Sequence, residues 1–301
     1  MALLIRNGLL YTQTARGTIR GDILLDQDGI LAVAEHIDAS SEVLEHIIDA
    51  DDLHICPGLI DPHMHLVRAA KYMKDDLSAL ADAALGAGVT TCALWQGDGE
   101  TVLLRHGHQE AAAGKPLRFL KVDGASDAAL REAMEAAATS GAALGCEIYS
   151  PAALKRVLAL TRETGCEVVL IHLIDCGDMA GEIIASGCPV ILGACCRRGT
   201  GSAYALAAVL HRAGVTVALT GDYPSTRLHH LPISAGLCLK EGLSTEEALH
   251  MITLGAAKLL GVDAVTGSIE PGKRADLAIF DGNPLMLASA RVMTVSGGQL
   301  L

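Results

Sequence analysis

The stretch PGLIDPHMHL, residues Pro57–Leu66, marks the point where the character of the chain changes. Its apolar start is typical of a buried strand, and His63 and His65 follow two residues apart. Because side chains alternate across a strand, these two imidazoles are expected on one face. Such a pair usually needs a partner, most often a metal ion, although two hydrogen-bonded core histidines are the simpler alternative.

The residues on either side of this stretch predict two kinds of structure. The first fifty-odd residues, and the segment GSIEPGKRADLAIFDGNP near the other end, place apolar runs between turn signals such as Asn-Gly, Asp-Gly and Pro-Gly. We therefore expect residues 1–56 and 268–301 to form one small β-sandwich domain from both ends of the chain.

Between residues 57 and 267, apolar strands alternate with Ala-rich helical stretches, and four of these stretches end at a glycine. This alternation predicts βα units around a parallel sheet. Eight units of this kind predict a compact (β/α)₈ barrel of the TIM type. The eight strands are expected at Gly58–Leu66, Val89–Trp95, Thr101–Leu104, Leu117–Val122, Leu144–Tyr149, Glu167–His172, Pro189–Leu192 and Val215–Thr220.

Composition limits the class of protein. The net charge of −12 argues against a nucleic-acid partner, and no apolar run is long enough to span a membrane. The nine cysteines are scattered without CxxC spacing, which indicates reduced thiols rather than a cysteine-rich zinc site. With no signal-peptide pattern, we expect a cytoplasmic protein that acts on a small molecule and assembles as a homo-oligomer.

Several ionisable residues lie at the ends of the expected strands. In a (β/α)₈ barrel the catalytic residues gather at this face. The candidates, in chain order, are His63, His65, Lys121, Glu147, His172 and Asp222. Less specific candidates are Arg197 and Arg198, which follow the seventh strand and are suited to a substrate carboxylate, and His230 in the loop after the eighth strand. His106 and His108 form a second HxH pair, but their neighbours predict an exposed loop.

Taken together, the motifs PGLIDPHMHL, GAGVTT and VALTGDYPSTRLHH resemble those of the amidohydrolase superfamily, in particular its imidazolonepropionase-like and dihydroorotase-like branches. The resemblance covers nearly the whole chain. It implies a centre of one or two divalent metal ions, usually zinc. The implied ligands are His63, His65, His172 and Asp222, together with Lys121 where CO₂ converts its amine to a carbamate.

The fifth strand departs from the superfamily pattern, because Glu147 stands where a histidine is usual. A carboxylate binds zinc at about the same distance as an imidazole, so Glu147 is one candidate ligand. An ion pair between Glu147 and an uncarboxylated Lys121 is the alternative.

The resemblance implies hydrolysis of a C–N bond by metal-activated water, with Asp222 as the proton acceptor. A cyclic amide is the first expectation for the substrate, and deamination is the second. A catalytically inactive relic of the fold, binding a metal or a ligand, is the non-enzymatic alternative.

Overall fold

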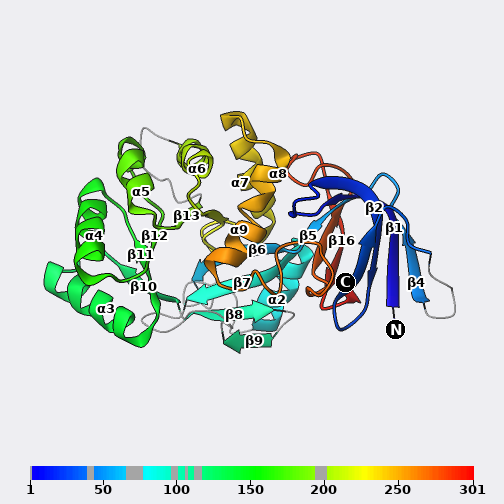
Figure 1. Cartoon of the computed structure of the whole chain (residues 1–301), viewed down its shortest axis with the longest axis horizontal. Helices are drawn as coiled ribbons and strands as arrows, with labels where there is room; N and C mark the ends of the chain where they lie inside the picture. Colours follow the sequence, from blue (N-terminus) through cyan, green and yellow to red (C-terminus); the bar gives the residue numbers. More distant parts are fainter. Residues whose placement is uncertain are drawn as a thin grey trace.

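The computed structural model describes residues 2–38, 44–65, 77–95, 101–105, 108–111, 117–193 and 202–301, with only the backbone for 105 and 108–111. The chain is a mixed α/β protein. Figure 1 shows a β-rich part at one end of the molecule, built from both ends of the sequence, and helix-flanked strands at the other.

Strands from both ends of the chain pair in one eight-stranded sheet. Strand β5 joins the two halves, because it pairs parallel with β1 and antiparallel with β15. The sandwich arrangement and the domain boundaries at 57 and 268 stay predictions. The strands of this sheet are β1 (Ala2–Tyr11), β2 (Thr18–Leu25), β3 (Ile30–Ala34), β4 (Leu44–Asp49), β5 (His54–Pro57), β15 (Leu277–Phe280), β16 (Arg291–Ser296) and β17 (Gln299–Leu300).

A five-stranded parallel sheet carries four consecutive βα units, which confirms this part of the expected alternation. Serine caps begin α3, α4 and α6, and glycines in the left-handed region end α3, α4 and α5. The elements are β10 (Leu117–Lys121), α3 (Asp127–Ser140), β11 (Ala143–Glu147), α4 (Pro151–Thr164), β12 (Val168–Ile171), α5 (Ala180–Ser186), β13 (Val190–Gly193), α6 (Ala203–Arg212) and β14 (Val217–Thr220).

A four-stranded sheet contains the strand with which the sequence analysis began. Strands β6 (Leu59–His65) and β7 (Val89–Trp95) are parallel and are joined through α2 (Leu77–Gly86). Strand β8 (Val102–Arg105) runs antiparallel to β7, and β9 (His108–Ala111) antiparallel to β8. The expected third parallel strand at Thr101–Leu104 is therefore wrong. Only residues 96–101 separate β7 from β8, whereas a parallel crossover needs a dozen or more residues.

Strand β6 and the end of β14 lie side by side where the two sheets meet. The Thr220 hydroxyl donates to the carbonyl of His63 at 2.7 Å, and the His65 N–H donates to the carbonyl of Tyr223 at 2.9 Å. Within the described ranges, the strands outside the terminal sheet divide into the four-stranded and the five-stranded sheet, so a closed barrel of eight strands is not observed.

Three short helices follow β14 and lead back to the terminal sheet: α7 (Leu231–Leu237), α8 (Thr245–His250) and α9 (Leu254–Leu259). Among the described residues, no helix combines the length and the apolar character needed to cross a membrane.

Candidate metal centre

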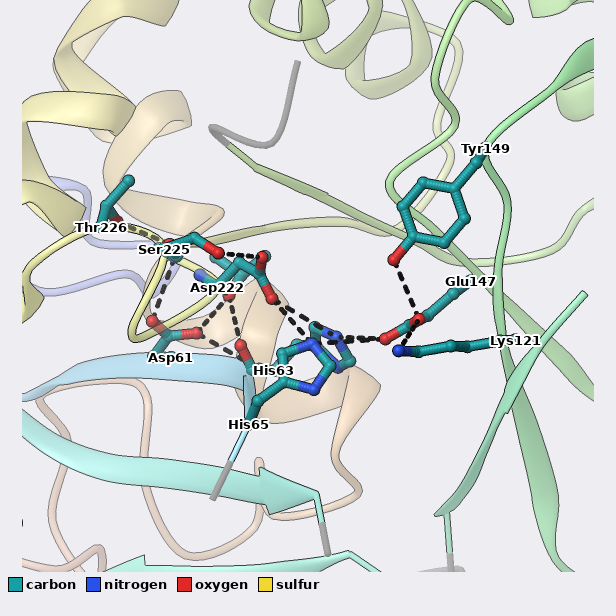
Figure 2. A network of polar contacts seen from close by, with 11 residues as sticks. Asp61, His63, His65, Lys121, Glu147, Tyr149, Asp222, Ser225 and Thr226 are labelled. Atoms are coloured by element: carbon teal, nitrogen blue, oxygen red, sulfur yellow. Dashed lines mark hydrogen bonds and ion pairs between the residues drawn. The ribbon is translucent and has the colours of Figure 1, made fainter. Parts of the chain in front are cut away.

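Four buried side chains from three strand ends converge at one point. His63 and His65 end β6, Glu147 ends β11, and His172 directly follows β12. Each offers one ligand atom, and these four atoms lie within 4.8 Å of one another. Figure 2 shows the imidazoles of His63 and His65 directed toward the carboxylate of Glu147. Residues expected at different strand ends therefore do meet.

The two oxygens of Glu147 have different surroundings. Its Oε1 lies 3.2 Å from Nε2 of His63 and 3.4 Å from Nε2 of His65. Its Oε2 accepts a hydrogen bond of 2.9 Å from the Tyr149 hydroxyl, and it lies 4.0 Å from Nζ of Lys121. The carboxylate thus connects the histidine cluster to Tyr149 and Lys121.

Asp222 lies beside the same histidines, two residues after β14. Its Oδ1 is 3.0 Å from Nε2 of His65 and 3.8 Å from Nε2 of His63. Its Oδ2 accepts a hydrogen bond of 2.9 Å from the Ser225 hydroxyl, which fixes the orientation of the carboxylate. Asp222 is therefore placed to contact any group bound by His63 and His65.

The backbone at two of these positions is in the left-handed region, with φ of 69° at His172 and 50° at Asp222. Residues other than glycine rarely adopt this conformation, and it concentrates at functional sites. Hydrogen bonds hold it in place here: the His172 N–H donates to the carbonyl of Ile191, and the Asp222 N–H donates to the Thr220 hydroxyl. The turns direct both side chains toward the cluster.

Asp61 belongs to the same network, although the sequence analysis gave it no role. It is fully buried, and it accepts hydrogen bonds from the N–H groups of His63 (3.2 Å) and Gly221 (3.1 Å). Its Oδ1 also lies 2.5 Å from the Thr220 hydroxyl. Burial raises the pKa of Asp61 to about 6 in spite of these donors. The two-residue strand period that pairs His63 with His65 also applies to position 61, and this signal was available in the sequence.

Aromatic rings enclose the histidines. Phe119 contacts His63 edge-on, with the two ring centroids 4.8 Å apart. The ring centroid of Trp95 lies 4.7 Å from that of His65. The ring centroid of Tyr149 lies 5.4 Å from that of His172, with the two rings tilted relative to each other. These apolar walls exclude water from the ring nitrogens and strengthen electrostatic interactions within the cluster.

The charge states of the cluster suit metal binding. Burial lowers the pKa of His63, and it lowers the pKa of His172 to about 4. Burial acts to raise the pKa of Glu147, but the surrounding histidines outweigh it and the pKa is lowered. Neutral imidazoles and an ionised carboxylate are the forms that bind metals.

The hydrogen-bonding of the cluster points the same way. Both ring nitrogens of His63 and of His172, and Oε1 of Glu147, are buried without a hydrogen-bond partner among the described residues. Buried polar atoms of this kind require an explanation, and a shared cation is one. The donor set fits a divalent metal ion.

Comparison with known proteins agrees with this geometry. A model of the "Amidohydrolase family" matches residues 119–301, which is more than half of the chain. The chain belongs to the amidohydrolase family. An imidazolonepropionase from Syntrophobacter fumaroxidans is 26% identical over 398 aligned positions, which cover 95% of this chain and 92% of that protein. The alignment is longer than this chain, so that protein has residues where this amidohydrolase has none.

A dihydroorotase from Streptococcus thermophilus is 26% identical over 178 positions, covering 56% of this chain and 42% of that enzyme, so the match spans less than half of that relative. Among solved structures, an amidohydrolase from Thermotoga maritima aligns over 99% of both chains with a TM-score of 0.83 at 18% identity. At that identity the similarity shows the shared fold alone.

The remaining site residues predicted from the sequence of this amidohydrolase do not belong to the buried cluster. Lys121 ends β10 with its side chain about half exposed. His230 is exposed and its ring packs on His229, so its role in substrate binding stays a prediction. Arg197, Arg198 and His106 lie outside the described residues. His108 begins strand β9 rather than lying in a loop, as its neighbours had suggested.

Proposed function

We propose that this amidohydrolase is a zinc-dependent hydrolase that cleaves the C–N bond of a small cyclic amide. The observation that carries the proposal is the buried cluster of His63, His65, Glu147 and His172 with Asp222 beside it. Three imidazoles and a carboxylate are ligands that zinc prefers in proteins. Two relatives support the substrate class, since their names, imidazolonepropionase and dihydroorotase, denote enzymes acting on cyclic amides.

The architecture supports the same proposal. We propose that the four-stranded and five-stranded sheets are parts of one (β/α)₈-type barrel, with β14 next to β6. Strand ends from both sheets then face one mouth, where active sites of such barrels lie. The solved amidohydrolase from Thermotoga maritima, with its TM-score of 0.83, supports this arrangement.

The chemistry assigns a separate task to each residue. A bound zinc ion supplies Lewis-acid activation of a water molecule and of the amide carbonyl. His63, His65, His172 and Glu147 would hold the ion. Asp222 accepts the proton of the attacking water at Oδ1 and passes it to the leaving nitrogen. The Ser225 hydroxyl donates a hydrogen bond to Oδ2 of Asp222 and so keeps Oδ1 directed toward the histidine cluster.

The proposal is tested by metal content and hydrolysis together. Protein purified without chelator is analysed for zinc, and ring opening of cyclic amides, including dihydroorotate, hydantoin and imidazolonepropionate, is followed by ultraviolet absorbance. Asp222→Asn keeps the shape of the side chain but cannot accept the proton, so we expect zinc to be retained and kcat to fall about 10²–10⁴-fold.

The matched control is Asp178→Asn, an exposed position before α5, which should leave both properties unchanged. Zinc binding without hydrolysis of any of these amides, or equal rates for the wild type and Asp222→Asn, would instead favour an inactive relic of the fold.

A further inference from the structure

The connection between β15 and β16, residues 281–290, places apolar side chains in solvent. Met286, Leu287 and Ala288 are consecutive and all exposed. Leu287 is 80% exposed, more than any other large apolar side chain among the described residues. An exposed apolar run of this kind is unfavourable in water and marks a surface that contacts a partner.

Hydrogen bonds hold this connection in one conformation. The Asp281 N–H donates to the carbonyl of Ala290 at 3.1 Å, and the Ala290 N–H donates to the Asp281 carboxylate at 2.7 Å. Inside the connection, the Met286 N–H donates to the carbonyl of Asn283, and the Ser289 N–H donates to the carbonyl of Met286. Because the exposed run is already ordered, covering it costs little conformational entropy.

A hollow of about 290 Å³ lies next to the exposed run. Its wall is largely apolar and includes Pro232 and Ile233 of α7, Phe280 of β15, and Pro284 and Met286 of the connection. A cavity of about 150 Å³ lined by Leu, Ile and Phe holds a molecule the size of benzene. The larger hollow therefore admits the side chain of a leucine.

The projecting side chain and the hollow belong to the same face, because Leu287 forms part of the rim of the hollow. A face with a projection beside a matching hollow is complementary to a second copy of itself when a two-fold axis relates the two copies. The Leu287 side chain of each copy then enters the hollow of the other.

The charges on this face also suit a second copy of the chain. The net charge is −12, with 35 Asp and Glu residues, so two copies repel each other over much of their surfaces. The residues that line the hollow include His229 and Arg291 but no Asp or Glu. Repulsion between carboxylates is therefore weak where the two hollows would meet.

Arg291 and Asp281 provide charges of opposite sign at the rim. Nη1 of Arg291 lies 3.3 Å from the neutral hydroxyl of Thr294, and its Nε is buried without a hydrogen-bond partner among the described residues. The exposed Asp281 accepts the N–H of Ala290, which directly precedes Arg291. Across a two-fold axis, Arg291 of one copy pairs with Asp281 of the other, and this pair occurs twice. Such pairs fix the orientation of an interface.

From these observations we infer that this face joins two copies of the chain in a symmetric homodimer. The dimer face consists of residues 86–87, 229–233 and 280–291. Its centre is Leu287 in the partner's hollow, and its rim is the two pairs of Arg291 with Asp281.

The first experiment measures the association state of the full chain by sedimentation equilibrium. We expect the wild type to be a dimer at micromolar concentration. Leu287→Asp would place a carboxylate in an apolar hollow, so we expect the dimer dissociation constant to rise about 30-fold or more. The matched control is Val209→Asp on α6, where the replaced side chain is 46% exposed, and it should leave association unchanged.

Circular dichroism and thermal unfolding show whether each variant is folded. A wild type that stays monomeric, which would leave this face to a small ligand or to a different protein, overturns the inference. A folded Leu287→Asp protein that dimerises as tightly as the wild type also overturns it.

The second experiment exchanges the charges at the rim. Arg291→Glu alone and Asp281→Lys alone each bring like charges together across the axis, so both should weaken the dimer. A mixed dimer of these two variants has opposite charges in both pairs again. We expect native mass spectrometry to show heterodimers that associate about ten-fold or more tightly than either variant alone. A mixture that associates no better than its components overturns the assigned pairs and the two-fold arrangement.

Discussion

Substituting Glu147 by glutamine tests the centre most directly. Glutamine keeps the shape and an oxygen, but it removes the one carboxylate among the four clustered side chains. That carboxylate is completely buried, with Oε1 at 3.2 and 3.4 Å from two imidazole nitrogens. We therefore expect Glu147→Gln to fold and to bind zinc much more weakly.

The magnitude follows from the role of the ligand. Removing a residue that only supports a metal ligand typically costs 10–100-fold in affinity, so losing a direct anionic ligand should reach at least 100-fold. This factor corresponds to about 2.7 kcal/mol. Because zinc stabilises the folded state by linkage, the stabilisation at a fixed excess of zinc falls by the same amount. In a chain of this size, that lowers the zinc-dependent gain in Tm by about 5 °C or more.

The assay compares thermal unfolding with and without zinc, alongside the zinc content after dialysis. The control is Glu132→Gln, an exposed position on α3 that lies outside the cluster. If Glu147→Gln binds the same number of zinc ions with the same affinity as the wild type, the carboxylate is not a ligand and the reasoning fails.

Three further substitutions probe the support of the site, each measured by urea unfolding of metal-free protein. Thr220→Val removes the hydroxyl that accepts a hydrogen bond from the Asp222 N–H and contacts Asp61, so we expect the free energy of unfolding to fall by about 1–3 kcal/mol. An unchanged midpoint of urea unfolding would show that this hydroxyl does not stabilise the site. Burial raises the pKa of Asp61 to about 6, so the folded state binds more protons than the unfolded chain between about pH 4 and 6. As the pH rises through this range, the free energy of unfolding of the wild type should therefore fall by about 3 kcal/mol relative to that of Asp61→Asn. If the free energies of unfolding of the two proteins change with pH in parallel, this prediction is wrong. Gly145→Ala would place a Cβ atom 2.5 Å from Cδ1 of Phe119 in the wall of the site, so we expect a loss of about 1–3 kcal/mol, whereas wild-type stability would show that Phe119 can move freely.

Much of the site was predictable because strand ends converge in this kind of fold. The positions of His63, His65, Glu147 and His172 at the ends of apolar runs were enough to expect their meeting. The glycines that end the helices, such as Gly141 and Gly165 with φ of 70° and 65°, were equally visible in the sequence.

Two features depended on information that local patterns do not hold. The direction of β8 is decided by which strand it pairs with, and only the short connection from Trp95 hinted at an antiparallel partner. The role of Asp61 depends on Thr220 and Gly221, which lie far away in the sequence. Burial and tertiary hydrogen bonds also set the pKa of Asp61, so residue type alone could not indicate it.

The four clustered side chains, which are the candidate metal ligands, come from two separate sheets, and this origin has a mechanical consequence. His63 and His65 lie on the sheet of β6, whereas Glu147 and His172 lie on the sheet of β10–β14. An ion bound by all four would cross-link the two sheets and close a chain loop that contains residues 66–146. This cross-link would lower the conformational entropy that the chain gains when the two sheets separate. With the ion bound, amide hydrogens of both sheets should therefore exchange with solvent at similar rates. Removing the ion with a chelator should allow the two sheets to open independently, so that their exchange rates differ.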